Sequence, residues 1–383
     1  MLKVLAGDLS ATFNLDGGHL SRYVQGRAAV IRSLCDQLLL HDQILVPTQD
    51  YLTAAGMVCL LGERNVISLL DADRLRFVRL QGVFAYARGT GPDGALLTFE
   101  DPQHKRPTDA PIEDSVRAAL ATITGRCSDV GRLSRLLIEH SQGLMTKDIV
   151  GAVLKDAYAD LKQTTLWDDS YRYPNPDLLA LPGMNTMQVR VLGPDTDVSH
   201  NVVDALLALA LMNMELYLSE SMGCVSTSTG SPIGDCIALK LPRLDRDHPA
   251  RSHLWSFMDV AGVPDLSKIL LADEQQMAEF LKLTLSADAQ QFRVWFHSNA
   301  NLSEREILKA YVDLLCQVPS VDRAPAKALR FAITTAVDAL PVPFLGAAAS
   351  FIDDFVVSKL LSGRSPKFFV ETLRSFAGRL KPH

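Results

Sequence analysis

Apolar side chains recur every three or four residues along most of the chain, which is the spacing of helices that bury one face. This pattern predicts a helix over residues 21–41, helices between residues 48 and 70, and three more between residues 116 and 157. Residues 201–218 are apolar on nearly every side, so we expect a buried central helix that ends at Gly223. Most of the chain is therefore predicted to be helical.

Short runs of β-branched, aromatic and leucine residues predict strands. Residues 44–46 are predicted to form a strand that Pro47 ends, and residues 187–191, in which apolar and polar side chains alternate, a half-buried strand. Three further runs, divided by glycines, are expected to pair as a small β meander. These three runs are residues 75–80, 83–87 and 95–99.

The last third of the chain is predicted to be helical and to contain a hydrophobic hairpin. Ser303 and Glu306 have the spacing of a capping box, which marks the start of a helix. Apolar helices over residues 325–339 and 344–361 are separated by Leu-Pro-Val-Pro, because proline breaks a helix interior. Another helix is expected to begin at Pro366. Its apolar side consists of Phe369, Leu373, Phe376 and Leu380.

Together these elements predict an α+β protein that is predominantly α-helical. The 383 residues exceed the usual size of one domain, so we expect more than one packed unit. Proline-containing polar stretches suggest the boundaries. We expect a small α+β unit with the meander over residues 1–110, a helical middle segment over 111–183, and a helical domain with the hydrophobic hairpin over 184–383.

Composition narrows the class of protein. With 48% hydrophobic and 21% charged residues, 23 glycines and six cysteines, the chain is neither disordered, nor collagen-like, nor a disulfide scaffold. The cysteines are scattered without a C-x-x-C pair, so reduced thiols are expected. No secretory signal and no apolar stretch of about 18 residues is recognised, which predicts a cytoplasmic protein.

Two glycine-rich stretches resemble binding loops but lack the necessary context. Gly89, Gly91 and Gly94 spell G-x-G-x-x-G, yet predicted strands lie on both sides, so we expect a hairpin loop and not a nucleotide site. Residues 223–236 lack both a lysine after Gly230 and a G-x-S-x-G elbow, so a surface loop is predicted. The candidate nucleophiles of that loop are Ser226, Ser228 and Ser231.

One group of carboxylates and imidazoles could hold a divalent cation for a hydrolytic reaction. Its members are Asp245, Asp247, His248 and His253. Pro249 and the interleaved arginines favour a solvated loop, so this metal site is kept only as an alternative. His297 is expected to be a hydrogen-bonded histidine at a helix end. The sequence offers no support for an acid–base role of Glu139 and His140.

Charge is distributed unevenly along the chain. The net charge of the chain is −6. Residues 323–383 carry nine Lys and Arg against four Asp and Glu, whereas residues 1–322 carry 29 Lys and Arg against 40 Asp and Glu. Such a basic segment can dock on its own acidic body, on a protein partner or on an anionic membrane. The residues expected to contact a partner or membrane are Phe344, Phe351, Phe355, Lys359, Arg364, Lys367, Arg374 and Arg379.

Three runs in the last third of the chain carry a weak family pattern. They are FRVW at residues 292–295, ALRF at 328–331 and GRSPKFF at 363–369. This pattern resembles the C-terminal part of uncharacterised, mostly helical bacterial proteins. The motifs are structural and not chemical, so the resemblance implies no activity. Proteins of this sort are often encoded in accessory or defence loci. This association orders the functional hypotheses but does not test them.

The sequence therefore predicts a bacterial, non-enzymatic interaction protein, with an anti-phage defence sensor or effector as the leading example. A protein partner or an anionic membrane is expected at the C-terminal hairpin, so the location is cytoplasmic or peripheral to the inner membrane. The acidic net charge disfavours nucleic acid as a partner, and no cofactor is expected. The alternatives are a metal-dependent hydrolase and a structural helical scaffold.

Overall fold

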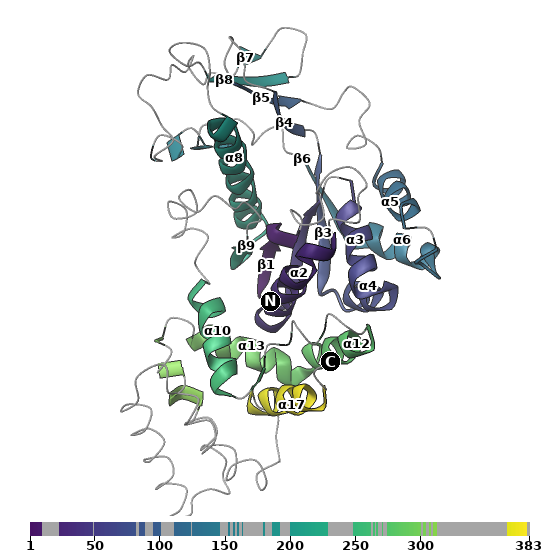
Figure 1. Cartoon of the computed structure of the whole chain (residues 1–383), viewed down its shortest axis with the longest axis vertical. Helices are drawn as coiled ribbons and strands as arrows, with labels where there is room; N and C mark the ends of the chain where they lie inside the picture. Colours follow the sequence, from purple (N-terminus) through teal and green to yellow (C-terminus); the bar gives the residue numbers. More distant parts are fainter. Residues whose placement is uncertain are drawn as a thin grey trace, which may run out of the picture. The chain divides into compact units, whose positions relative to one another are not determined.

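The computed structural model divides into two compact units (Figure 1). Unit 1 consists of Met1–Val30 and Gln43–Arg246, and unit 2 of Ile31–Asp42 and Asp247–His383. The structure describes residues 1–9, 23–48, 50–81, 84–88, 95–100, 111–123, 125–145, 152–153, 156–157, 159–160, 163, 179–180, 186–191, 200–228, 248–261, 263–264, 266, 270, 274–299, 302–303, 306–307, 309–311 and 366–380. The boundaries predicted near residues 110 and 184 both fall inside unit 1.

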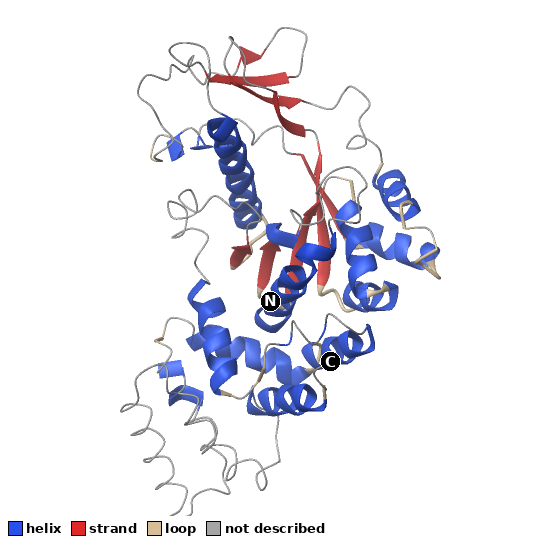
Figure 2. Cartoon of the chain, viewed as in Figure 1, coloured by secondary structure: helices blue, strands red, loops and turns tan. Residues whose placement is uncertain are grey.

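The protein is α+β and predominantly helical, as the sequence predicted (Figure 2). Helix α2 (Tyr23–Leu40) matches the predicted first helix within two residues. The division between the units runs through this helix after Val30. One continuous helix therefore contributes to both units.

Unit 1 is built on a five-stranded sheet in which every neighbouring pair is parallel. In spatial order the strands are β6 (Ser141–Met145), β3 (Leu75–Gln81), β2 (Gln43–Thr48), β1 (Lys3–Ala6) and β9 (Ser226–Ser228). All six residues of β2 are buried, as expected for a parallel strand covered on both faces. From β1 the chain steps through β2 and β3 to β6, and only later places β9 on the opposite side of β1.

Four helices of unit 1 pack on one another. They are α3 (Leu52–Leu61), α4 (Glu63–Asp71), α5 (Ile112–Ala121) and α6 (Val130–Glu139). Apolar residues at helical spacing are buried on the last two, with Val116 and Leu120 on α5 and Leu133 and Leu137 on α6 each at most 3% exposed. The same spacing groups Val130 with Leu133 and Leu137, but Val130 is 46% exposed at the first turn of α6.

Helix α8 (His200–Ser221) is the predicted long apolar helix, and it contacts β1 and β9. It ends as predicted, because Gly223 adopts φ 63° and Cys224 N donates to Ser219 O at 2.9 Å, closing the last turn. The helix is not buried on every side, since Leu211 and Tyr217 are 46% and 42% exposed. Apolar composition alone could not show which of its faces lacks a neighbour.

A second sheet in unit 1 is antiparallel. Its strands, in spatial order, are β4 (Phe84–Arg88), β5 (Ala95–Glu100), β8 (Thr186–Val191) and β7 (Leu179–Ala180). The pairing of β4 with β5 confirms that strands flank the glycine-rich residues 89–94, and β8 matches the predicted strand. The first run of the predicted meander, β3, pairs instead with β2 and β6, because alternation identifies a strand but not its partners.

Pro47 lies within β2 and does not end it. Gln43 N bonds Leu2 O on the β1 side and Ile44 N bonds Arg74 O on the β3 side, so by alternation the nitrogen of residue 47 faces β1. The β1–β2 ladder finishes at Leu5 and Leu45, whereas β2 continues along β3. The missing N–H of Pro47 therefore falls where β1 has already turned away, and no ladder bond is lost.

Unit 2 is helical. Its main helices are α10 (His248–Val260), α12 (Glu274–Thr284), α13 (Ala287–Asn299) and α17 (Pro366–Arg379), and α17 packs against α12 and α13. The helix predicted from Pro366 is confirmed, and of its predicted apolar side Phe369, Leu373 and Phe376 are at most 2% exposed, whereas Leu380 follows the last residue of α17 and is half-buried. The ring of Phe369 lies 5.1 Å from that of Phe292 on α13, so the last helix belongs to the core of unit 2.

Residues 31–42 are held in unit 2 by specific polar contacts. Arg293, which is 4% exposed, donates from Nε to Asp42 Oδ1 at 2.8 Å and from Nη1 to Thr284 O at 3.1 Å. Trp255 Nε1 donates to Asp36 Oδ1 at 2.8 Å. Breaking a buried ion pair by removing one partner costs about 3–5 kcal/mol, so these bonds fix the second half of α2.

Two sequence predictions on short segments are confirmed. The capping box forms, since Ser303 Oγ and N both donate to Glu306 Oε2, at 2.7 and 2.8 Å, and Glu306 N donates to Ser303 Oγ at 3.4 Å. His297 at the end of α13 is hydrogen-bonded through Nε2 to Leu40 O at 2.8 Å. Among the described residues, no single helix has the length and apolarity needed to cross a membrane.

Candidate functional site

The candidate site lies at the carboxyl edge of the parallel sheet, which we define by the residues that end or follow β1, β2 and β9. In open parallel sheets, ligands bind outside the carboxyl ends of the strands, where successive connections leave in opposite directions. Here that position is β1, because β2 lies on one side of it and β9 on the other. The fold therefore points to the residues that follow Ala6.

Asp8, two residues beyond β1, is the central acidic group of this edge. Its Oδ1 accepts a hydrogen bond from Leu9 N at 3.0 Å and another from the hydroxyl of Ser228 at the end of β9. The register aligns Ala6 with Ser228, so the two strand ends meet side by side. Both side chains are half-buried, which leaves the pair in reach of solvent.

Strand β9 corrects a sequence prediction. Residues 223–236 were expected to form a surface loop, but Ser226–Ser228 forms a strand parallel to β1. Three hydroxyl residues have no apolar pattern, and only the pairing with β1 makes this segment a strand. Of the candidate nucleophiles, Ser228 reaches Asp8, Ser226 lies within β9, and Ser231 is outside the described residues.

A second carboxylate approaches the same edge from α8. An ideal Cβ placed on Gly7 would lie 2.1 Å from Glu215 Oε1, so the carboxylate of Glu215 rests directly on the backbone of Gly7. Only glycine leaves this space free without displacing the side chain. Two acidic groups, Asp8 and Glu215, thus flank the end of β1.

The turn after β2 completes the edge. Thr48 Oγ1 accepts from Tyr51 N at 3.0 Å, and Asp50 Oδ1 accepts from Leu52 N, the first N–H of α3, at 3.0 Å. Tyr51 has φ 62°, a left-handed conformation that is unfavourable for a bulky residue. The turn keeps this strained residue because its side chain is fully buried.

A buried cation lies beside this turn. Arg79 on β3 pairs with Thr48, is fully buried, and donates from Nη2 to Ser115 Oγ on α5 at 2.9 Å. Burial raises the pKa of the neighbouring Tyr51 hydroxyl, and Ser141 and Arg79 only partly oppose that effect. Because Arg79 is enclosed, we assign it to positioning α5 and the β2 turn and not to contact with a ligand.

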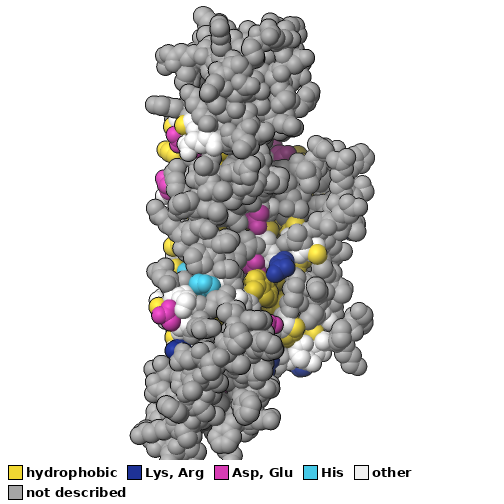
Figure 3. Space-filling model, turned by 60° about the vertical axis from the view of Figure 1, so that its left-hand side comes forward, with side chains coloured by type: hydrophobic (Ala, Val, Ile, Leu, Met, Phe, Trp, Pro, Cys, Tyr) yellow, Lys and Arg dark blue, Asp and Glu magenta, His cyan; other side chains and the backbone are white. Residues whose placement is uncertain are grey.

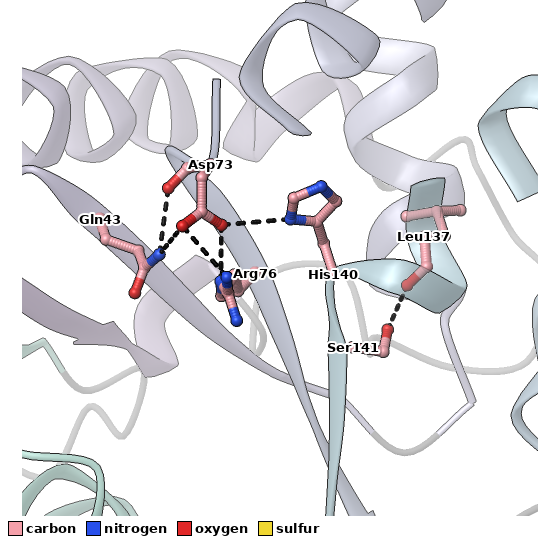
Figure 4. Close-up of polar contacts among 6 residues, drawn as sticks. All are labelled: Gln43, Asp73, Arg76, Leu137, His140 and Ser141. Atoms are coloured by element: carbon pink, nitrogen blue, oxygen red, sulfur yellow. Dashed lines mark hydrogen bonds and ion pairs between the residues drawn. The ribbon is translucent and has the colours of Figure 1, made fainter. Parts of the chain in front are cut away.

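The opposite, amino edge of the sheet carries a different polar cluster (Figure 4). Arg76 binds the carboxylate of Asp73 through Nε at 2.6 Å and Nη2 at 3.1 Å, and His140 Nδ1 lies 3.2 Å from Asp73 Oδ1. Gln43 Nε2 donates to Asp73 Oδ2 at 2.9 Å and to its carbonyl at 3.1 Å. These bonds tie together the starts of β2, β3 and β6, so the cluster stabilises the sheet.

The predicted metal group is only partly described. Asp245 and Asp247 lie outside the described residues, as does the side chain of His248. The solvated loop predicted around Pro249 is wrong from residue 248 onward, because α10 begins there and a proline in the first helical turn loses no bond. His253 is half-buried on α10, and no group of three or more potential ligands occurs among the described residues.

Most residues of the predicted partner surface lie outside the described part of the chain. Phe344, Phe351, Phe355, Lys359 and Arg364 fall there, and so does the side chain of Lys367. On α17, Arg374 is half-buried and Arg379 is exposed. On the face drawn in Figure 3, the described charged side chains lie at separate places.

Comparisons of the chain with protein-family models, with curated proteins and with solved structures gave no match. Of the residues that bond to one another at the carboxyl edge, the sequence singled out only Ser228, as a candidate nucleophile. Asp8 belongs to no motif, and its partners Ser228 and Glu215 come from the distant β9 and α8. The one local signal was a Gly-Asp pair directly after an apolar strand.

We predict that Gly7→Ala displaces the Glu215 carboxylate and destabilises unit 1 by on the order of 0.5–1 kcal/mol, a modest cost because the clashing atoms end a flexible side chain that can shift its rotamer. In a Glu215→Ala background the same substitution should cost much less, because the clashing atom is gone. Urea unfolding of the single and double variants measures this coupling. Equal costs in both backgrounds would show that Glu215 does not rest on Gly7.

We predict that Asp73 contributes stability above about pH 5 that is lost on acidification. Burial alone would raise the pKa of Asp73, but Arg76 and then His140 outweigh it and lower the pKa. The ionised form is thus favoured in the folded state, and the benefit disappears as the pH falls through the unfolded pKa of about 3.9 and then the lower folded pKa.

Asp73→Asn is the test, since asparagine tolerates the φ of 54° at this position. The side chain is 41% exposed, so we expect a loss on the order of 1 kcal/mol at pH 7 that shrinks below pH 4. Urea unfolding between pH 3 and 7 measures it, with the exposed Asp114→Asn as the matched control. A loss that is unchanged at pH 3 would contradict the prediction.

Proposed function

We propose that unit 1 binds a small, uncharged ligand through its hydroxyl groups, such as a nucleoside or a monosaccharide, at the carboxyl edge of the parallel sheet. The observation that carries the proposal is the position of Asp8, directly beyond the strand at which the order of the sheet reverses. The proposed role is binding and not catalysis, in keeping with the non-enzymatic function expected from the sequence.

The chemistry of the edge supports this class of ligand. Ionised carboxylates only accept hydrogen bonds, and vicinal hydroxyls can donate to one carboxylate in the manner of a ribose in dinucleotide-binding folds. Asp8 and Glu215 both lie at the end of β1. Two negative charges would repel a phosphate group, so a nucleoside should bind better than its phosphate.

The test is a thermal-shift and calorimetric screen of the full-length protein against matched pairs of neutral and phosphorylated compounds. We expect at least one nucleoside or sugar to raise the melting temperature, with a weaker effect of its phosphate. Asp8→Asn should reduce the affinity about tenfold or more, since a hydrogen bond to a charged group contributes about 1.5–3 kcal/mol.

The control is Asp259→Asn, which removes an exposed carboxylate on α10 in unit 2 and should leave binding unchanged. If the Asp8→Asn variant binds the ligand as tightly as the unaltered protein, the binding site does not lie at the carboxyl edge. Tighter binding of the phosphates would reject the proposed ligand class.

We also propose, from the sequence, that the hairpin over residues 325–361 contacts a protein partner or an anionic membrane. Helix α17 lies outside this hairpin, and its apolar residues Phe369, Leu373 and Phe376 are buried in unit 2. Removing residues 325–361 while keeping α17 should abolish co-sedimentation with anionic vesicles or pull-down of a partner. Equal behaviour of the shortened and full-length chains would reject it.

A further inference from the structure

One segment of unit 1 is pinned to the corner between α3 and α4 by Glu63. Ser128 donates from N and Oγ to Glu63 Oε2 at 2.7 and 2.6 Å, and Asp129 N donates to Glu63 Oε1 at 2.8 Å. Burial opposes ionisation of Glu63, but these hydrogen bonds outweigh it and lower its pKa. Three hydrogen bonds to a charged group hold residues 128 and 129 firmly in place.

This anchor brings two cysteines to the same corner. Cys127 directly precedes the pinned residues, and Cys59 lies in the last turn of α3. The chain bends by 115° between α3 and α4 at Gly62, so Glu63 begins α4 immediately beside the end of α3. Both thiols belong to half-buried residues, whereas Cys35 is fully buried.

The charged groups around the two thiols differ. Burial raises the pKa of Cys127, and the negative charges of Glu63 and of an ionised Cys59 raise it further. Burial also raises the pKa of Cys59, but the guanidinium of Arg126 opposes this effect. Cys59 is therefore the thiol whose anion has a stabilising cation beside it.

We propose that Cys59 and Cys127 form a reversible disulfide that links the end of α3 to the segment before α6. A hydroperoxide is the oxidant class. The Cys59 thiolate attacks the peroxide oxygen and becomes a sulfenic acid, while the leaving oxygen is protonated and departs as water or an alcohol. The Cys127 thiolate then attacks the sulfenic sulfur, and the displaced hydroxide takes up a proton to leave as water.

The reaction should be slow at neutral pH and faster at higher pH, because raised thiol pKa values limit the fraction of thiolate. The bridge should be reversible with dithiothreitol. Cys35 should stay reduced because its side chain is fully buried. Cys224 should stay reduced because burial raises the pKa of its thiol to about 11.

The experiment treats the full-length protein, carrying Cys236→Ser and Cys316→Ser so that these two thiols cannot compete, with hydrogen peroxide at pH 7 and pH 9. Peptide mapping by mass spectrometry after thiol blocking should find one crosslink, Cys59 to Cys127, that forms faster at pH 9. The chain has six cysteines, and the double variant keeps four of them. The number of free thiols measured by titration should therefore fall from four to two.

Two matched comparisons keep the test specific. Glu63→Ala removes the anchor of the segment and should lower the share of Cys59–Cys127 among the crosslinks formed, even though loss of the Glu63 charge favours the Cys127 thiolate, whereas Asp114→Asn on the exposed side of α5 should leave that share unchanged. In urea the crosslink should lose its specificity, because unfolding separates the two thiols and exposes Cys35 and Cys224 as competing partners. Absence of the crosslink in the native protein, or the same share of Cys59–Cys127 among the crosslinks of native and urea-unfolded chains, would overturn the proposal.

Discussion

Unit 1 depends on the parallel pairing of β1 with a partner on each side. Strand β2 follows it closely in the chain, whereas β9 arrives only after the second sheet and α8 have been made. Because parallel strands align their carboxyl ends, this double pairing brings Ser228 to Asp8. The contact of α8 with β1 then places Glu215 over Gly7, so the whole carboxyl edge follows from the position of one four-residue strand.

The two edges of the same sheet use polar residues in opposite ways. At the amino edge, Asp73 is surrounded by Arg76, His140 and Gln43, and its charge is neutralised by its neighbours. At the carboxyl edge, Asp8 and Glu215 bring like charges toward one strand end. A carboxylate that is paired with cations stabilises the fold, whereas neighbouring groups of like charge are more often found at binding sites.

Local physics explains which elements could be predicted from the sequence. Helices such as α2, α8 and α17 have apolar positions whose spacing is a property of the segment itself, so their presence and much of their buried side were predictable. Sheet membership was not, because β3 carries the same alternation whether its neighbours are parallel or antiparallel. Helix α10 was missed because Pro249, which stops a helix interior, is tolerated in a first turn.

The candidate site could not be predicted from the sequence for a related reason. The contact between Asp8 and Ser228 spans 220 positions, and neither residue belongs to a motif that predicts the other. The Ser303 and Glu306 box was predictable since both partners are local.

The shared helix α2 has a consequence for how the chain is made. Asp42 is synthesised 251 residues before Arg293, its partner in unit 2. At about 5–20 residues per second, the nascent chain must wait roughly 10–50 s before this ion pair can close. During translation the second half of α2 therefore leaves the ribosome with its eventual binding surface still unmade, and it must stay soluble, or be held by a chaperone, until the downstream helices emerge.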